Sequence, residues 1–317
     1  MQGVLFFADA GPRVGMGHVT RSRPVLDLLR QKGVEVQMIA PINHSRIEDL
    51  GFGDTVSVPD RSEDVCTLIG SRGVDQVVID SYRYIPEICA TVRRMGDTRL
   101  VLFDDHYEPE EGVQVIINGS PAAKKTSYKT CVAERFLLGP RYASICAVFK
   151  EARDRFIVRD EVRKVLVSLG GSDMNHRIKE FVMALDEALP ARVEILVTGA
   201  GGQKGRVHYL GWLGQGELAS SMCDCDFAFF AGGSTLVQVA CVGLPTAAWP
   251  QTDGQRKHAG VWSDQGSVIL LESLEEIRMV VNRCFGKETR RRMSESGRAV
   301  VDGLGSRRIA EALLQES

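Results

Sequence analysis

A glycine-rich turn near the start of the chain carries a histidine and an arginine, and these residue types suggest chemistry. The turn reads Gly11-Pro-Arg-Val-Gly-Met-Gly-His-Val-Thr-Arg21 and lies between an apolar run and a segment with helical periodicity. A strand, a glycine-rich turn and a helix in that order direct backbone N–H groups and the positive end of a helix dipole at an anion. Gly15 and Gly17 would let such a ligand approach the backbone. We therefore predict an anion-binding turn.

His18 is our first choice for a catalytic base, because histidine can exchange a proton near pH 7. The alternative is that it caps the turn or binds a phosphate without proton transfer. Arg21 follows three residues later, on the same face of the predicted helix. It could bind a phosphate or sugar oxygen bidentately, or it could form a salt bridge with Asp104 or Asp105. Arg13 is a weaker candidate for the same role.

Two further predicted strands end in polar clusters, Asp80-Ser-Tyr82 and Asp104-Asp-His-Tyr107. Successive strand residues point to opposite sides, so we expect only one of the paired aspartates to face a ligand, where it could orient His18 or bind sugar hydroxyls. Asp80 and that aspartate could instead supply the two carboxylates of glycosidase chemistry. A metal site at Asp-Asp-His is a further alternative. Both tyrosines could contact a sugar or lie on the rim. We assign catalytic roles to His18, Asp105 and Tyr82, and binding roles to Asp80, Asp104 and Tyr107.

The second half of the chain has two glycine-rich turns of its own, Gly170-Gly-Ser-Asp173 and Gly232-Gly-Ser-Thr235. Each follows a predicted strand, and glycines with neighbouring hydroxyls suit a diphosphate. The second turn opens a predicted helix, for which Ser234 is a plausible N-cap. The alternative is that both are ordinary strand-to-helix turns. For His258 we favour a solvated helix face. The residues predicted to bind the nucleotide are Gly171, Ser172, Asn175, Gly233, Ser234, Thr235, Gln238 and Gln255.

Composition limits the classes of partner. The 317 residues are 44% apolar and 25% charged, with a formal net charge of −2. This balance gives no electrostatic reason to expect nucleic acid or an anionic membrane as partner. No apolar run approaches the roughly 20 residues that span a bilayer. The N-terminus does not resemble a signal peptide, and the eight scattered cysteines suggest free thiols in a reducing cytoplasm. We expect a cytoplasmic protein.

Short apolar runs alternate with helical patterns in both halves, which is typical of parallel α/β sheets. We expect strands at 4–8, 34–40, 55–58, 76–80, 100–104, 113–118, 164–169, 193–198, 207–210, 227–231, 246–249 and 268–271. We expect helices at 21–31, 63–71, 86–95, 177–189, 217–223, 235–242, 255–265 and from 274 onward. A charged stretch from Phe149 to Phe156 separates the two series. The expected architecture is therefore two Rossmann-like domains, 1–150 and 151–317, facing a central cleft.

Six motifs together resemble a known family, the UDP-sugar hydrolases of pseudaminic acid biosynthesis, and the related spore-coat polysaccharide proteins. They are Gly15-x-Gly-His-x-x-Arg21, Ile79-Asp-x-Tyr82, Phe103-Asp-Asp105, Leu138-Gly-Pro-x-Tyr-Ala143, Gly170-Gly-Ser-Asp173 and Gly232-Gly-Ser-Thr-Leu236. The resemblance covers nearly the whole chain. It implies a GT-B fold and hydrolysis of the anomeric bond of a UDP-linked diacetamido-trideoxy sugar, with no cofactor, in a monomer. The reaction would release UDP and a free sugar. The sugar would serve the synthesis of a nonulosonic acid for a surface glycan, such as that on flagellin.

The chain departs from the pattern of this family at three places. Gln238 stands where the family usually has a glutamate that can hold ribose hydroxyls. Gly254-Gln255 replaces Asn-Gln, and Ile145-Cys146 replaces Leu-Arg. The residues expected to bind the nucleotide therefore match the family pattern less well than the His18 turn does. Two alternatives stay open: a GT-B glycosyltransferase that passes the sugar to an acceptor, and a nucleotide-sugar-binding protein without catalytic activity.

Overall fold

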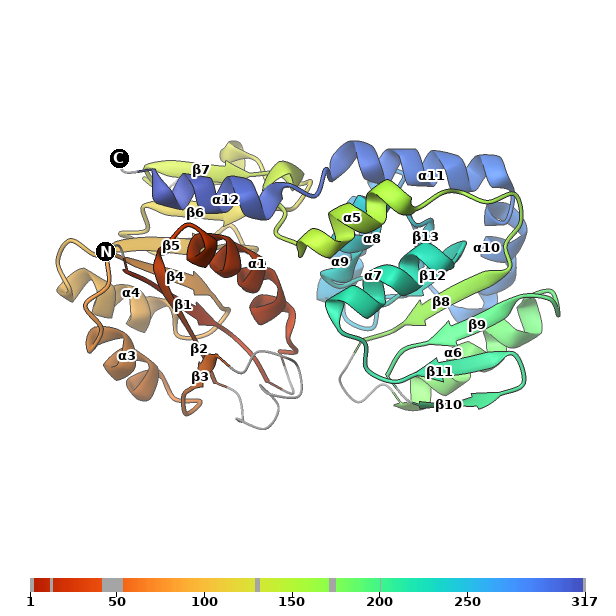
Figure 1. Ribbon diagram of the computed structural model, residues 1–317, viewed down its shortest axis with the longest axis horizontal. Helices are drawn as coiled ribbons and strands as arrows, with labels where there is room; N and C mark the ends of the chain where they lie inside the picture. The colour runs from red at the N-terminus through yellow and green to blue at the C-terminus, as the bar shows by residue number, and fades with distance from the viewer. Residues whose placement is uncertain are drawn as a thin grey trace. The chain divides into compact units, whose positions relative to one another are not determined.

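A computed structural model describes residues 3–11, 14–41, 54–128, 132–170, 175–199 and 201–315 of the chain, with the backbone alone at 175 and 176. The chain forms two compact units, labelled by element in Figure 1. The first unit comprises Met1–Cys146 together with Leu304–Ser317, and the second comprises Ala147–Gly303. A single boundary at residue 150 does not describe this division, because the end of the chain returns to the first unit.

The first unit contains a seven-stranded sheet of order β3-β2-β1-β4-β5-β6-β7, in which every pairing is parallel. Its central strands are buried on both faces, which explains their continuous apolar runs. The strands are β1 (Gly3–Ala8), β2 (Glu35–Ala40), β3 (Thr55–Ser57), β4 (Gln76–Asp80), β5 (Arg99–Phe103), β6 (Val115–Asn118) and β7 (Arg135–Leu138).

Helices cover both faces of this sheet (Figure 1). Alternate residues of β1 separate the two cores, because Phe6 packs with α1 and α12 while Phe7 packs with α3 and α4. The helices are α1 (Gly17–Gln31), α3 (Ser62–Gly70), α4 (Ile85–Arg94) and α12 (Gly305–Leu314), with short 3-10 helices at Lys125–Ser127 and Pro140–Tyr142. α1 begins one turn before the predicted residue 21, which places His18 in its first turn.

The C-terminal helix α12 is part of the first core. Ile309 and Leu313 are buried against α1, and the Gln76 side-chain amide donates to the Leu313 carbonyl over 2.8 Å. At its start, a side chain on Gly305 would place Cβ 2.1 Å from the Ala143 carbonyl oxygen, so only glycine fits there. The apolar face of α12 therefore completes a core that begins 300 residues earlier in the sequence.

The second unit has a seven-stranded sheet of order β10-β11-β9-β8-β12-β13-β14, parallel except for the β10–β11 pair. Its strands are β8 (Lys164–Ser168), β9 (Glu194–Val197), β10 (Gly201–Lys204), β11 (Val207–Leu210), β12 (Phe227–Phe230), β13 (Thr246–Ala248) and β14 (Val268–Leu270). Its helices are α5 (Ala147–Arg155), α6 (Asn175–Ala188), α7 (Gln215–Asp224), α8 (Thr235–Val242), α9 (Asp253–Asp264), α10 (Ile277–Cys284) and α11 (Lys287–Val300), with a 3-10 helix at Leu274–Glu276. The charged stretch taken as a linker is therefore largely helix α5.

The strand order reverses at one place in each sheet. In the first sheet this place lies between β1 and β4, and in the second it lies between β8 and β12. Open parallel sheets bind ligands outside the carboxyl ends of the strands at such a switch point. His18 follows β1, Asp80 ends β4 and the Gly232–Thr235 turn follows β12. The fold therefore places the predicted residues where ligands bind in this class of sheet.

Candidate active site

Asp80 is the centre of the polar cluster in the first unit. Its carboxylate is fully buried and accepts hydrogen bonds from three side chains of α1. His18 Nδ1 lies 2.6 Å from Oδ1, and the Ser22 hydroxyl donates to Oδ2 over 2.8 Å. Arg21 donates through Nη2 to Oδ1 over 2.6 Å and through Nε to Oδ2 over 2.8 Å. Both carboxylate oxygens are thus occupied, which makes Asp80 an orienting group and not a ligand for sugar.

The contact with Asp80 fixes the orientation of the His18 ring. A carboxylate only accepts, so His18 donates through its Nδ1–H group, and Nε2 is the ring nitrogen that is not bonded to Asp80. Among the residues that the structure describes, no partner is bonded to His18 Nε2, and the side chain is almost buried. Asp104 and Asp105, the predicted orienting groups, do not contact this ring. The correction follows from strand order, because β4 pairs with β1 directly and β5 does not.

Charge holds Asp80 ionised. Burial raises the pKa of this carboxyl, but the neighbouring Arg21 charge, and then His18, lower it by more, and the pKa falls to about 2. Burial likewise lowers the pKa of Arg21, yet Asp105 and Asp80 raise it well above its ordinary value. The cluster therefore contains a carboxylate that is ionised at neutral pH beside the imidazole.

Arg21 extends the cluster to the two other predicted catalytic residues. Its Nη1 donates to Asp105 Oδ2 over 2.7 Å, and the Tyr82 hydroxyl donates to the same oxygen over 2.8 Å. The Tyr82 ring meets the His18 ring edge to face, with centroids 4.5 Å apart, while 48% of Tyr82 stays exposed. Burial raises the pKa of Asp105, but Arg21 lowers it by more. Burial and the charge of Asp105 raise the pKa of Tyr82. His18, Asp105 and Tyr82 therefore lie together, as predicted.

Asp104 does not bond to Arg21 as Asp105 does, but accepts hydrogen bonds from the backbone. Its Oδ1 accepts the backbone N–H groups of His106 (2.8 Å) and Tyr107 (3.0 Å), and Tyr107 adopts a left-handed conformation with φ of 64°. Its Oδ2 is buried without a hydrogen-bond partner among the described residues, and burial raises its pKa. In the described ranges no three His, Cys, Asp or Glu residues are grouped to hold a metal ion. Asp104 therefore organises the turn that carries Tyr107.

A second Asp–Arg–Asp arrangement beside the site was not predicted. Asp9 follows β1 directly, is fully buried, and accepts from Arg83 Nε over 2.9 Å and from Arg83 Nη2. Arg83 Nη1 also donates to both oxygens of Asp60, over 2.7 and 2.8 Å. The available signal was the position of Asp9 directly after β1, one residue beyond the register position of Asp80.

The glycine turn before α1 has the predicted geometry. Gly15 has a φ of 80°, a conformation that favours glycine, and its N–H donates to the Gly11 carbonyl over 2.7 Å. In the described part of the chain, the N–H groups of Gly17, His18 and Val19 have no acceptor, as expected for a first helical turn. The predicted anion-binding role of this turn stays a prediction. Arg13 lies outside the described residues.

The second unit has a comparable turn before α8. A side chain on Gly232, whose φ is 87°, would place Cβ 3.1 Å from the Gln255 carbonyl oxygen. The N–H groups of Gly233, Ser234 and Thr235 have no acceptor within the described ranges. Ser234 is the N-cap residue of α8, as expected, but its side chain makes no capping hydrogen bond in the described structure. Gly171 and Ser172 lie outside the described residues, as does the side chain of Asn175.

The other predicted nucleotide residues are engaged within the second unit. Gln238 is buried and donates to Gln215 Oε1 over 3.0 Å. Gln255 Oε1 accepts the N–H of Gln251 over 2.8 Å, which ties it to its own loop. His258 is half-buried, not solvated as we expected, because Nδ1 lies 2.9 Å from the Gly232 carbonyl and Nε2 accepts from Trp262. These contacts hold α9 against the Gly232 turn.

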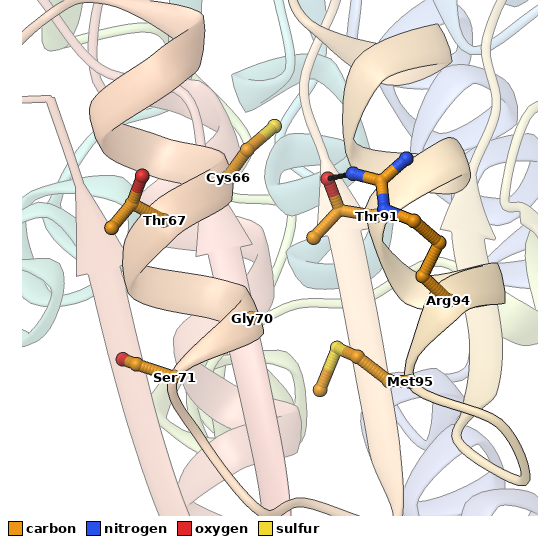
Figure 2. Close-up of a pocket in the computed structure, with 7 residues that line it drawn as sticks. All are labelled: Cys66, Thr67, Gly70, Ser71, Thr91, Arg94 and Met95. Carbon is orange, nitrogen blue, oxygen red and sulfur yellow. Dashed lines mark hydrogen bonds between the residues drawn. The ribbon is translucent and has the colours of Figure 1, made fainter.

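A surface pocket of about 510 Å³ lies elsewhere, between α3 and α4 (Figure 2). It is lined by Cys66, Thr67, Gly70, Ser71, Thr91, Arg94 and Met95. Figure 2 shows the Arg94 guanidinium turned back onto Thr91, whose hydroxyl accepts over 3.1 Å. No predicted site residue lines this pocket.

Two observations concern the whole described chain. Its seven described cysteines are free, and burial raises the pKa of the Cys225 thiol. None of its described helices has the length and apolar character needed to cross a membrane.

Comparison with known proteins identifies the fold. No protein-family model matches the chain. The spore coat polysaccharide biosynthesis protein SpsG of Bacillus subtilis (strain 168) is 24% identical over 330 residues, covering 98% of this chain and 97% of that protein. MurG of Acinetobacter baumannii superposes with a TM-score of 0.71 at 13% identity, covering 98% of this chain and 99% of its own. UDP-GlcNAc 2-epimerase of Neisseria meningitidis, solved with UDP-GlcNAc, gives 0.67 at 12% identity and covers both chains completely. The chain therefore has a two-unit α/β fold of GT-B type.

Proposed function

We propose that this protein hydrolyses the anomeric bond between sugar and diphosphate in a UDP-linked diacetamido-trideoxy sugar. The observation that carries the proposal is the Asp80–His18 pair, whose buried carboxylate lies 2.6 Å from Nδ1 and leaves Nε2 as a base. A base of this kind suits the activation of water. The free sugar would feed synthesis of a nonulosonic acid for a surface glycan.

In the proposed reaction His18 Nε2 takes a proton from water, and the resulting hydroxide attacks the anomeric carbon. The carbon–oxygen bond to the diphosphate breaks with its electron pair, so UDP leaves as an anion. Asp80 stabilises the imidazolium that forms, because its carboxylate is buried and ionised. Arg21 holds Asp105 and Asp80 in fixed positions by hydrogen bonds to both. Asp105 and Tyr82 would contact the sugar, with Asp104 and Tyr107 beside them.

The second unit would bind the nucleotide. Its free N–H groups at Gly233, Ser234 and Thr235 suit a diphosphate, because they point outward from the start of a helix. The names of the compared proteins support a nucleotide-sugar ligand, since one acts in polysaccharide biosynthesis and another was solved with UDP-GlcNAc.

Hydrolysis is tested by incubating the purified protein with UDP-linked diacetamido sugars in ¹⁸O-labelled water. We expect UDP release with the label in the sugar, which means attack at carbon. Label in the phosphate would mean attack at phosphorus. Release only with an added acceptor would indicate a transferase, and an altered sugar configuration in an intact nucleotide sugar would indicate an epimerase. Each of these outcomes contradicts the proposal.

The His18→Gln variant tests the role of the base. It should lose about 10²- to 10⁴-fold in kcat, the usual contribution of a general base, while UDP binding survives. His208→Gln, a half-buried histidine of β11, is the matched control and should keep its rate. A His18→Gln enzyme that turns over as fast as the wild type would exclude His18 as the base.

A further inference from the structure

The guanidinium of Arg177 lies over the indole of Trp249, and we propose that it binds a phosphate of the nucleotide in the second unit. This inference rests on the proposed function and adds a residue to it. Arg177 Cζ is 4.9 Å from the ring centroid, and Phe181 stacks on the same ring at 4.9 Å with an interplanar angle of 27°. The indole is buried, whereas Arg177 is exposed. The aromatic ring therefore holds an exposed cation in place.

The position of this cation follows from the strand order. Arg177 lies in the first turn of α6, the helix after β8, whereas Trp249 directly follows β13. In the sheet β12 lies between β8 and β13. Neighbouring strands are about 4.8 Å apart, so an arginine that reaches from α6 to Trp249 passes beside the carboxyl end of β12. That strand leads into the turn of Gly233, Ser234 and Thr235, whose N–H groups lack acceptors among the described residues.

The two features complement one another chemically. The amide turn offers hydrogen-bond donors and a partial positive charge, but a diphosphate carries at least two full negative charges. A guanidinium supplies a full charge and can donate two parallel N–H groups to a phosphate. Within the described chain no carboxylate pairs with Arg177. Because the indole restrains the side chain before binding, less conformational freedom is lost when the ligand arrives.

The experiment compares binding of UDP, uridine and inorganic pyrophosphate by calorimetry. Arg177→Met keeps an apolar cover on Trp249 and removes the charge and its donors. We expect its dissociation constants for UDP and pyrophosphate to rise about 10- to 100-fold, with uridine binding unchanged. Arg177→Lys should be intermediate, because a lysine keeps the charge without the planar fork. Arg192→Met, an exposed arginine at the amino end of β9, is the control and should bind all three ligands like the wild type.

Three results would overturn the inference: wild-type UDP binding by Arg177→Met, equal losses for uridine and UDP, and a wild type that binds neither UDP nor pyrophosphate. If Arg177→Met bound UDP as tightly as the wild type, Arg177 would only pack on the indole and would not bind a phosphate. If Arg177→Met lost affinity for uridine and UDP equally, the substitution would have damaged the binding site in general. A thermal unfolding midpoint like that of the wild type, together with a loss confined to UDP and pyrophosphate, would exclude such damage. A wild type that binds neither UDP nor pyrophosphate would refute the inference together with the nucleotide role of the turn. If UDP binding depends on Arg177 but no sugar is hydrolysed, the hydrolase proposal fails and this inference stands.

Discussion

Ionised Asp80 should stabilise the first unit at neutral pH, and acid should remove this stabilisation. Its folded pKa of about 2 lies below the ordinary value of 3.8. A group with a lowered folded pKa contributes stability above its unfolded pKa and loses it as the pH falls through the folded pKa. The difference corresponds to about 2 kcal/mol, of which roughly half should be lost by pH 3.

The Asp80→Asn variant isolates this contribution. An amide replaces one acceptor oxygen by a donor that faces the donors of Arg21 or Ser22. Breaking a buried ion pair in this way costs about 3–5 kcal/mol. We expect a loss of this size in the free energy of unfolding at pH 7. Between pH 5 and pH 3 the variant should then lose about 1 kcal/mol less than the wild type, because it has no carboxylate to protonate.

Urea unfolding at several pH values measures both effects. All three tryptophans, Trp212, Trp249 and Trp262, lie in the second unit, so their fluorescence follows that unit while far-UV circular dichroism follows both. Asp97→Asn, at an exposed position, is the control and should keep the wild-type pH dependence. Identical acid dependence of Asp80→Asn and the wild type would refute the reasoning. If Asp80→Asn does not fold, Ser22→Ala removes one donor to Asp80 and should shift the acid transition to higher pH.

Three further predictions concern packing, ion pairing and thiol reactivity. Gly305→Ala should lower the free energy of unfolding by about 1–3 kcal/mol, because Cβ would meet a backbone carbonyl at 2.1 Å. Arg83→Met should lower it by about 3–5 kcal/mol, because the buried carboxylate of Asp9 would lose its partner. Peptide mapping after brief iodoacetamide treatment should find Cys66 modified well before Cys225, since burial raises the pKa of the Cys225 thiol.

Matched variants control the first two of these measurements. Gly216→Ala adds a methyl group to α7 with nothing within 4 Å and should not destabilise the protein. Arg61→Met removes an exposed pair with Asp64 and should cost about 1 kcal/mol or less. Equal effects of Gly305→Ala and Gly216→Ala, or of Arg83→Met and Arg61→Met, would contradict the structural reasons given. Faster modification of Cys225 than of Cys66 would contradict the third prediction.

The central strands and the position of the active-site turn could be predicted from sequence. The apolar run Val4–Ala8 of β1 is buried on both faces of the sheet, so its composition alone indicates a central strand. The partner of His18 could not be predicted, because it depends on which strand pairs with β1. Asp80 and Asp105 both end strands in the sequence, and only the sheet order brings Asp80 beneath the imidazole.

Helices and strands with few buried apolar residues could not be predicted from the sequence. Helix α5 is rich in charge, and only Phe149 and Ala152, three residues apart, are buried in it. Strand β10 is exposed along its length and has no alternation to recognise. His258 lies among charged neighbours in the sequence, yet the bond to the Gly232 carbonyl draws it inward. In each case a few tertiary contacts outweigh the local composition.

The return of α12 to the first core has a consequence for the order of synthesis. The second unit is one continuous stretch, 147–303, and all of it leaves the ribosome before the last residues of the first unit do. Domains generally fold as units during synthesis. The unit whose strands emerge first therefore waits for α12, and the face of its sheet that α1 covers stays incomplete until Leu304–Ser317 have been made. Truncation at the C-terminus would thus damage the half of the protein that carries His18.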